Sequence, residues 1–172
     1  AGLLVDSTVP PLLLNNLIDG GSGSFNADAL VVKNAGTAGG GTLFMLSNIL
    51  RAQGSTGNKL KVEDGNGKLW LFRNAFTGGN PGCPISAEFQ GTPGCRTLAD
   101  PSWDRRASGT INDFETDCGI AADYHLPGNS FCIDMGGDLA FIGGQQGFDG
   151  SPFVDIDGTM RPLNTGWDIG PD

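Results

Sequence analysis

Histidine, basic residues and long apolar runs are scarce in this sequence. It contains one histidine, His125, and ten Lys and Arg against nineteen Asp and Glu, which gives a formal net charge of −9 at pH 7. Such a chain repels polyphosphates, so we expect no nucleic-acid partner. No apolar run approaches the roughly 20 residues that cross a bilayer as a helix. The sequence therefore predicts no transmembrane segment, and its start at Ala1 is typical of a processed, secreted product.

Motifs of catalysis are also missing. There is no nucleophile elbow, P-loop, dinucleotide fingerprint or haem motif. His125 lies in a predicted loop between Gly119 and Pro127, where we expect a surface or structural residue. Nineteen acids supply carboxylate pairs in any arrangement, so such pairs do not indicate a glycosidase. We predict that the chain is not an enzyme and has no cofactor other than the calcium considered below.

Cysteine occurs four times but never as Cys-x-x-Cys, which makes a zinc site improbable in a chain with one histidine. We expect two disulfides among Cys83, Cys95, Cys118 and Cys132. Sequential pairing would stabilise the fold by about 3 kcal/mol for each bond, and the other two pairings stay open. Persistent disulfides imply an oxidising compartment, so we expect an extracellular protein.

Glycine is abundant, with 29 of 172 residues, and predicts a chain of turns and short strands. One helix is expected over residues 42–53, where Leu43, Leu46, Ile49 and Leu50 recur at near-helical spacing. The predicted fold class is α+β, mostly β, with that short helix, a small antiparallel sheet and long disulfide-bonded loops.

The expected sheet begins with a hairpin. Alternating residues over 59–64 and 68–73 flank the turn signal Asp64-Gly65-Asn66-Gly67. Glycines separate three further strand candidates at 130–135, 138–142 and 152–156. The run at 25–33 fits either a strand or the start of a helix.

The N-terminal residues are rich in leucine and interrupted by Pro10-Pro11. We expect residues 1–24 to form an apolar arm with a Gly/Ser turn, and residues 25–172 to form a single β-rich domain. Short elements covering the core are one interpretation of the arm; docking on another chain is the other. The predicted partner-binding residues are Leu3, Leu4, Val5, Leu12, Leu13, Leu14, Leu17 and Ile18.

Asp155 and Asp157 are the candidate metal ligands. The sequence Asp155-Ile156-Asp157-Gly158 offers two carboxylates to a calcium ion but lacks the remaining ligands of an EF-hand. The alternative is that these side chains cap a tight turn through backbone hydrogen bonds.

The segment from Phe153 to Asp168 resembles the C-terminal signature of type IV pilin-like and pseudopilin-like proteins. The positions that carry the resemblance are Asp155, Asp157, Gly158, Pro162, Gly166 and Asp168. Leu163 departs from it, because the family usually has Asn there and this chain has Asn164 one position later. The match covers sixteen of 172 residues. It implies a pilin-head-like fold whose long apolar helix was removed or lies on a separate chain.

We therefore expect a structural subunit of a cell-surface filament, a type IV pilus or a pseudopilus-like assembly. Its partners would be other copies of itself or a short helical pilin chain, bound through the apolar N-terminal segment. The alternative is a secreted, calcium-dependent carbohydrate-binding or adhesin module, in which Trp70, Trp103 or Trp167 would stack on sugar rings.

Overall fold

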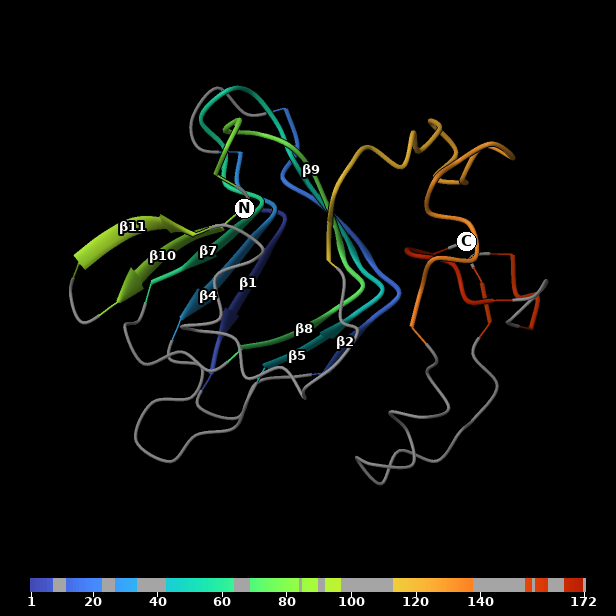
Figure 1. The fold of residues 1–172 in the computed structure, drawn as a ribbon, viewed down its shortest axis with the longest axis horizontal. Coiled ribbons are helices and arrows are strands. Elements are labelled where there is room, and N and C mark those ends of the chain that lie inside the picture. Colours follow the sequence, from blue (N-terminus) through green and yellow to red (C-terminus); the bar gives the residue numbers. More distant parts are fainter. Residues whose placement is uncertain are drawn as a thin grey trace.

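The structure is a computed structural model that describes most of the chain (Figure 1). The described residues are 1–7, 12–22, 27–33, 43–63, 69–83, 85–89, 92–96, 113–137, 154–155, 157–160 and 166–171. Within them every regular element is a strand.

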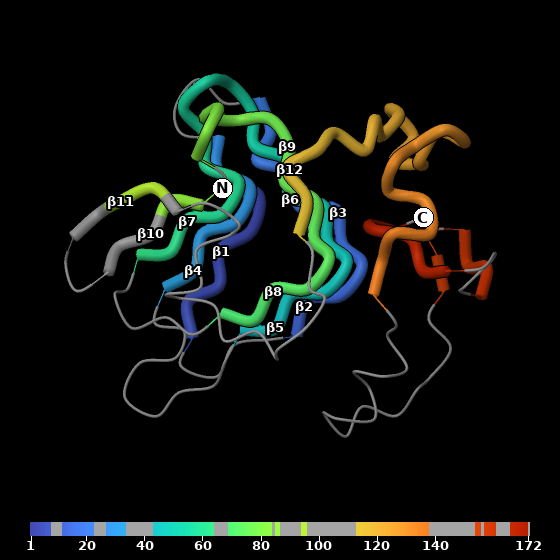
Figure 2. The backbone as a smooth tube through the Cα atoms, in the orientation of Figure 1, coloured from blue at the N-terminus to red at the C-terminus, as the bar shows by residue number. Residues whose placement is uncertain are grey.

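The strands form a three-sided parallel β-solenoid, in which each coil contributes one strand to each of three sheets (Figure 2). The first coil consists of β1 (Leu3–Asp6), β2 (Leu12–Leu14) and β3 (Leu17–Asp19). The second consists of β4 (Leu30–Lys33), β5 (Leu43–Leu46) and β6 (Ile49–Ala52). The third consists of β7 (Leu60–Val62), β8 (Leu69–Phe72) and β9 (Ala75–Gly78). Strands of successive coils pair in parallel and in register.

The fourth coil ends the stack differently. Strand β10 (Ile85–Phe89) pairs in parallel with β7, and β12 (Phe114–Glu115) pairs in parallel with β9. Strand β11 (Thr92–Arg96) turns back and pairs antiparallel with β10. The resulting sheets have the orders β1-β4-β7-β10-β11, β2-β5-β8 and β12-β9-β6-β3.

Stacked apolar side chains fill the inside of the solenoid. Each sheet contributes residues from successive coils, so that Leu30 and Leu60 pair in register, as do Met45 and Leu71. All four are 1 % exposed or less. Burial of an aliphatic side chain contributes about 1.5 to 3 kcal/mol, so this core holds the coils together.

A two-residue corner joins the second and third sheets in each of the first three coils. Its first residue, Asn15, Ser47 or Arg73, has a positive φ of 49°, 54° or 51°. Its second residue is asparagine each time, at positions 16, 48 and 74. The left-handed residue reverses the chain direction sharply, and the asparagine supplies hydrogen bonds that the bent backbone does not make.

The corner asparagines form a hydrogen-bonded ladder along the solenoid. Nδ2 of Asn16 donates to Oδ1 of Asn48 at 2.9 Å, and Nδ2 of Asn48 donates to Oδ1 of Asn74 at 3.0 Å. Nδ2 of Asn74 donates to Oδ1 of Asp113 at 2.9 Å. Each acceptor oxygen also receives the backbone N–H of the preceding ladder residue, at 2.8 to 3.0 Å. The ladder therefore holds the corners of all four coils in register.

The predicted helix over residues 42–53 is wrong, and with it the α+β fold class. Its described residues form β5 and β6, separated by the corner Ser47–Asn48. Strand β5 is apolar on both faces, because Met45 lies in the inner core while Leu46 packs outside against Trp167. Leu43 and Leu50 point into the core while Leu46 and Ile49 point outward, and together these four residues have the sequence spacing of one helix face.

The predicted hairpin and antiparallel sheet are also wrong. Strands β7 and β8 lie close to the predicted ranges, but they belong to different sheets and each pairs in parallel with other coils. The turn at 64–67 and the strand at 138–142 lie outside the described residues. Residues 131–134 form a turn, and Val154 makes an isolated antiparallel bridge to Met160. The run at 25–33 contains strand β4.

The segment after β12 packs against the outside of the solenoid beside β3, β6 and β9 (Figure 2). Ile49 and Ala75 point outward there and are buried against Cys118, Cys132 and Ile169. A backbone contact strengthens this packing: Gly170 N–H donates to Ser47 O at 2.7 Å.

The segment also contacts the left-handed corner residues. Gly137 N–H donates to Ser47 Oγ at 2.8 Å, and Arg73 Nη1 donates to Met135 O at 3.2 Å. Phe72 and Leu46 leave no room for a side chain at Gly137. The segment after β12, called the outer layer below, is therefore in direct contact with the corners.

Both predicted disulfides are present and the pairing is sequential. Cys83 bonds to Cys95, which links the chain before β10 to β11, and Cys118 bonds to Cys132 within the outer layer. This pairing is consistent with an oxidising environment.

The ladder yields a test of stability. Asn48 is fully buried, so Asn48→Leu leaves the side chains of Asn16 and Asn74 without their partner. We expect a loss of about 3 kcal/mol in the free energy of unfolding, measured by urea denaturation with the disulfides intact.

Asn16→Leu is the matched control, because Asn16 is exposed at the end of the ladder and should cost less than about 1 kcal/mol. Equal losses for the two variants would mean that the ladder does not stabilise the fold.

Candidate partner-binding site

The first coil places three strand edges at one end of the molecule. Strands β1, β2 and β3 each stand at the end of their sheet and pair on one side only, with β4, β5 and β6. The backbone alternates along β1: Leu3 N–H donates to Ala29 O at 2.9 Å and Ser7 N–H donates to Lys33 O at 3.3 Å. The intervening amide of Leu4 therefore faces away from β4. Within the described residues these edges pair on one side only, and edges of this kind accept a further strand.

The predicted partner-binding residues all lie on these three strands. Val5 and Ile18 point inward and are buried in the core, and Leu3 and Leu13 pack against it. Leu17 packs beneath the outer layer. Leu4 is 54 % exposed and is the most accessible of the set. Leu12 and Leu14 are half-buried on β2. Most of these apolar side chains are thus used within the fold, while β1, β2 and β3 have no second neighbour among the described strands.

The corner of the first coil ends the ladder with an acceptor. Among the described residues, Asn16 Oδ1 receives no hydrogen bond, whereas the corresponding oxygen of Asn48 receives two. The neighbouring Asn15 also has both polar side-chain atoms buried without a partner in the described part of the chain. The buried side chain of Asn15 is therefore incompletely satisfied, which distinguishes this corner from the corners at 47–48 and 73–74.

An ion pair anchors the first coil to the second. Arg51 Nε donates to Asp19 Oδ2 at 2.9 Å, and Gly21 N–H donates to Asp19 Oδ1 at 2.8 Å. Partial burial raises the pKa of Asp19, but the hydrogen bonds from Gly21, Arg51 and Gln53 outweigh it and lower the pKa below the usual 3.8. The carboxylate form is therefore the one that holds β3 against β6.

A second charge cluster lies on β4 and β7. Lys33 and Lys61 both contact Glu63, each at 2.7 Å. Their hydrogen bonds lower the pKa of Glu63. This exposed cluster links neighbouring coils and contributes little stability for each ion pair.

Asp155 serves as a turn cap in the structure. Its Oδ1 accepts the N–H groups of Asp157 and Thr159, at 2.9 and 2.7 Å. Asp157 is exposed, and its Oδ1 lies 3.8 Å from Nε2 of His125. No group of three or more His, Cys, Asp or Glu within the described residues gathers as metal ligands would. The calcium site stays a prediction.

Other residues of the pilin-like pattern hold the C-terminal segment in place. Asp168 Oδ1 accepts the N–H of Asp134 at 2.6 Å, and Asp134 Oδ1 accepts the N–H of Gly166 at 3.0 Å. Gly158 has a φ of 80° in the turn capped by Asp155. Pro162 lies outside the described residues. These contacts are local to the outer layer and do not involve the first coil.

The tryptophans of the carbohydrate-binding alternative lie against apolar neighbours where they are described. The rings of Trp70 and Phe44 meet edge to face, with centroids 4.9 Å apart, and Trp167 packs against Leu46. Trp103 lies outside the described residues. The geometry therefore does not favour a sugar-stacking platform at Trp70 or Trp167.

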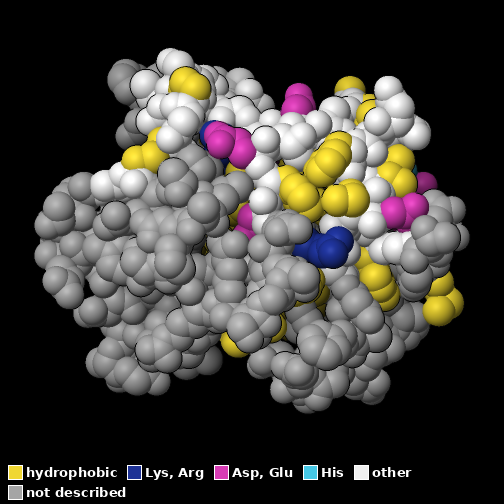
Figure 3. All heavy atoms as spheres, viewed as in Figure 1, with side chains coloured by type: hydrophobic (Ala, Val, Ile, Leu, Met, Phe, Trp, Pro, Cys, Tyr) yellow, Lys and Arg dark blue, Asp and Glu magenta, His cyan; other side chains and the backbone are white. Residues whose placement is uncertain are grey.

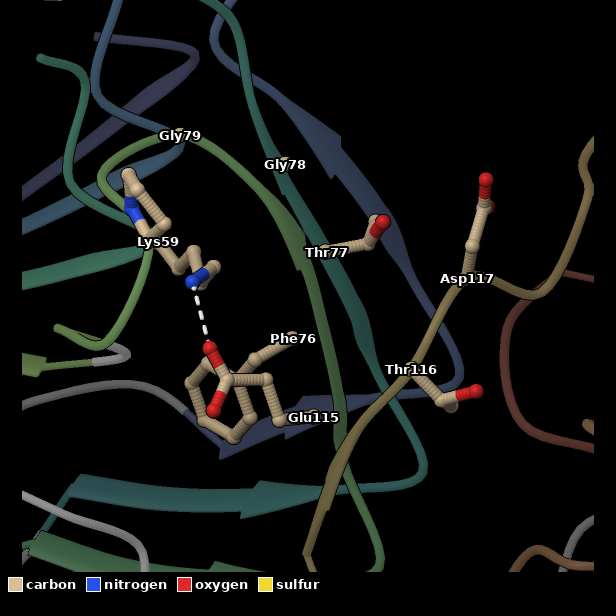
Figure 4. A pocket seen from close by; sticks show the side chains of 9 residues that line it. Lys59, Phe76, Thr77, Gly78, Gly79, Glu115, Thr116 and Asp117 are labelled. Carbon is tan, nitrogen blue, oxygen red and sulfur yellow. Dashed lines mark hydrogen bonds and ion pairs between the residues drawn. The ribbon is translucent and has the colours of Figure 1, made fainter. Parts of the chain in front are cut away.

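A groove of about 350 Å³ lies between β9 and the segment after β12 (Figure 4). Lys59, with only 3 % of its side chain exposed, donates to Glu115 Oε1 at 2.9 Å and to Asn80 O at 3.2 Å. In Figure 4, Thr77, Thr116 and Asp117 lie apart from this pair. Among the described residues that line the groove, Lys59 is thus already paired and joins the third coil to β12 through Glu115.

Exposed large hydrophobic residues are few among those described. Besides Leu4, they are Tyr124, Phe131, Val154 and Met160, all in the segment after β12. Figure 3 shows the described hydrophobic side chains of one face in several small patches among polar atoms. No helix in the described part of the chain is long and apolar enough to cross a membrane.

Comparison with protein-family models, curated proteins and solved structures finds no match. The case for a function therefore rests on the geometry of the chain itself.

The Asp19 anchor predicts a pH dependence. Because its pKa is lower in the folded state, Asp19 contributes stability above its unfolded pKa of about 3.8, and that contribution disappears as the pH falls through the folded value. Asp19→Asn should therefore lower stability at pH 7 and lose less stability than wild type between pH 5 and pH 2. Urea denaturation across that range measures both effects.

Asp123→Asn, in an exposed turn, serves as the control and should follow the wild-type curve. Parallel curves for Asp19→Asn and wild type would contradict the role of the anchor.

Proposed function

We propose that this chain is a structural, non-catalytic unit of an extracellular assembly, and that it joins its partner through the first coil. The observation that carries the proposal is the set of three aligned strand edges on β1, β2 and β3. A coil whose strands pair on one side only leaves backbone groups open for pairing.

Strand addition suits these edges better than the helical pilin chain expected from the sequence. The backbone groups of a helix are bonded within the helix, so it has few to offer to an edge such as that of Leu4. The pilin resemblance rests on the C-terminal pattern, whose described residues lie in the outer layer. We therefore propose a cell-surface assembly in which the partner contributes an extended segment.

The two disulfides and the net charge of −9 support this location and role. Cys83–Cys95 and Cys118–Cys132 both lie outside the first coil, in the parts of the chain that follow β9. A high net negative charge keeps such a unit soluble until its partner pairs with the strand edges of the first coil.

A proline at Leu4 tests the proposal. Leu4→Pro removes an N–H that faces away from β4, so it blocks strand addition without removing a hydrogen bond of the solenoid. In the source cells, wild-type chain should be recovered in a high-molecular-weight surface fraction, and Leu4→Pro should elute as the free chain in size-exclusion chromatography.

Leu4→Thr is the matched control, because it keeps the N–H and a strand-favouring side chain while removing the exposed apolar group. It should remain in the assembly. Wild-type chain that is monomeric in the surface fraction, or equal assembly of both variants, would overturn the proposed function.

A further inference from the structure

The asparagine ladder has a chemical direction. In every step the residue of one coil donates its N–H and Nδ2 to the Oδ1 of the next coil, from Asn16 to Asn48 to Asn74 to Asp113. A carboxylate accepts hydrogen bonds but has no N–H of its own to donate. The ladder therefore ends chemically at Asp113, whose side chain cannot pass a donor to a further coil.

The opposite end is built to continue. Asn16 Oδ1 occupies the position at which Asn48 and Asn74 accept two donors, and no described residue donates to it. A coil added before β1, β2 and β3 would place its corner N–H groups at this oxygen. A corner asparagine also bonds to the backbone of the preceding coil: Nδ2 of Asn48 donates to Leu13 O at 2.9 Å. With a coil added before β1, Asn16 would have a backbone carbonyl in the equivalent position.

We propose that the first coil binds a partner segment of strand–corner–strand form whose corner carries a left-handed residue followed by asparagine. This inference rests on the proposed function and names the chemistry of its partner. The asparagine N–H and Nδ2 of that segment donate to Asn16 Oδ1, while its flanking strands pair with β2 and β3. Continuity with the internal ladder selects this occupant over an arbitrary β-strand.

A second copy of the chain is a poorer occupant. In a head-to-tail stack its last ladder residue would be Asp113, which has a backbone N–H but no side-chain donor for Asn16. The two ends of the ladder therefore do not complement each other in such a stack.

A peptide–protein double-mutant cycle tests this selection. The probe is a labelled peptide with the sequence of residues 43–52, which contains one complete corner, extended by lysines for solubility. A second peptide has leucine in place of its asparagine. Binding of both to the full chain is measured by fluorescence anisotropy, and we expect the asparagine peptide to bind about tenfold more tightly.

The same preference should disappear in Asn16→Leu, which removes the acceptor, and persist in Asn16→Asp, which keeps it. Circular dichroism and urea denaturation verify that each variant is folded. Equal binding of the two peptides to wild type, or a preference that survives Asn16→Leu, overturns the inference but leaves strand addition at β1 to β3 standing. Failure of the asparagine peptide to bind at all overturns it as well.

Sedimentation equilibrium of the chain alone provides the remaining arm. We expect a monomer. Self-association that is lost in Asn16→Leu would overturn the choice of this occupant and make a second copy the occupant.

Discussion

The hydrogen bond from one corner asparagine to the next is the interaction on which the rest of this structure depends. A two-residue corner with a left-handed first residue leaves backbone groups that no sheet can satisfy, and the asparagine side chain satisfies them between coils. Because Asn16, Asn48 and Asn74 align, the strands on either side also align. The inner core and the outward row that includes Ile49 and Ala75 follow from that register.

The outer layer extends the same constraint to the C-terminal part of the chain. Ser47 accepts from Gly137, and Arg73 donates to Met135, so the left-handed corner residues that the ladder positions also hold the layer. The Cys118–Cys132 disulfide shapes the layer where strands are absent from its described residues. The solenoid and the disulfide-bonded segment are therefore two parts of one packing arrangement, joined at the corners.

Sequence reasoning predicted the disulfides and the positions of β7 and β8, but it placed a helix over β5 and β6 and missed how the strands pair. Parallel coils bring together residues 26 to 39 positions apart, which local turn signals do not reveal. One signal was present: Leu14-Asn15-Asn16-Leu17, Leu46-Ser47-Asn48-Ile49 and Phe72-Arg73-Asn74-Ala75 repeat one pattern. An internal repeat of this kind indicates a solenoid. The site at Leu3 to Ile18 was predicted from apolarity, whereas its backbone edges become evident only once the coils are stacked.

One connection between sheets has a constant length in the first three coils, whereas another varies in length from coil to coil. The corner between the second and third sheets always contains two residues, whereas the connection between the first and second contains five residues after Asp6, nine after Lys33 and six after Val62. All length variation at these two joints thus falls along one border of the solenoid. Insertions of different lengths are therefore tolerated along this border, where binding sequences can be added without shifting the stacking of neighbouring coils.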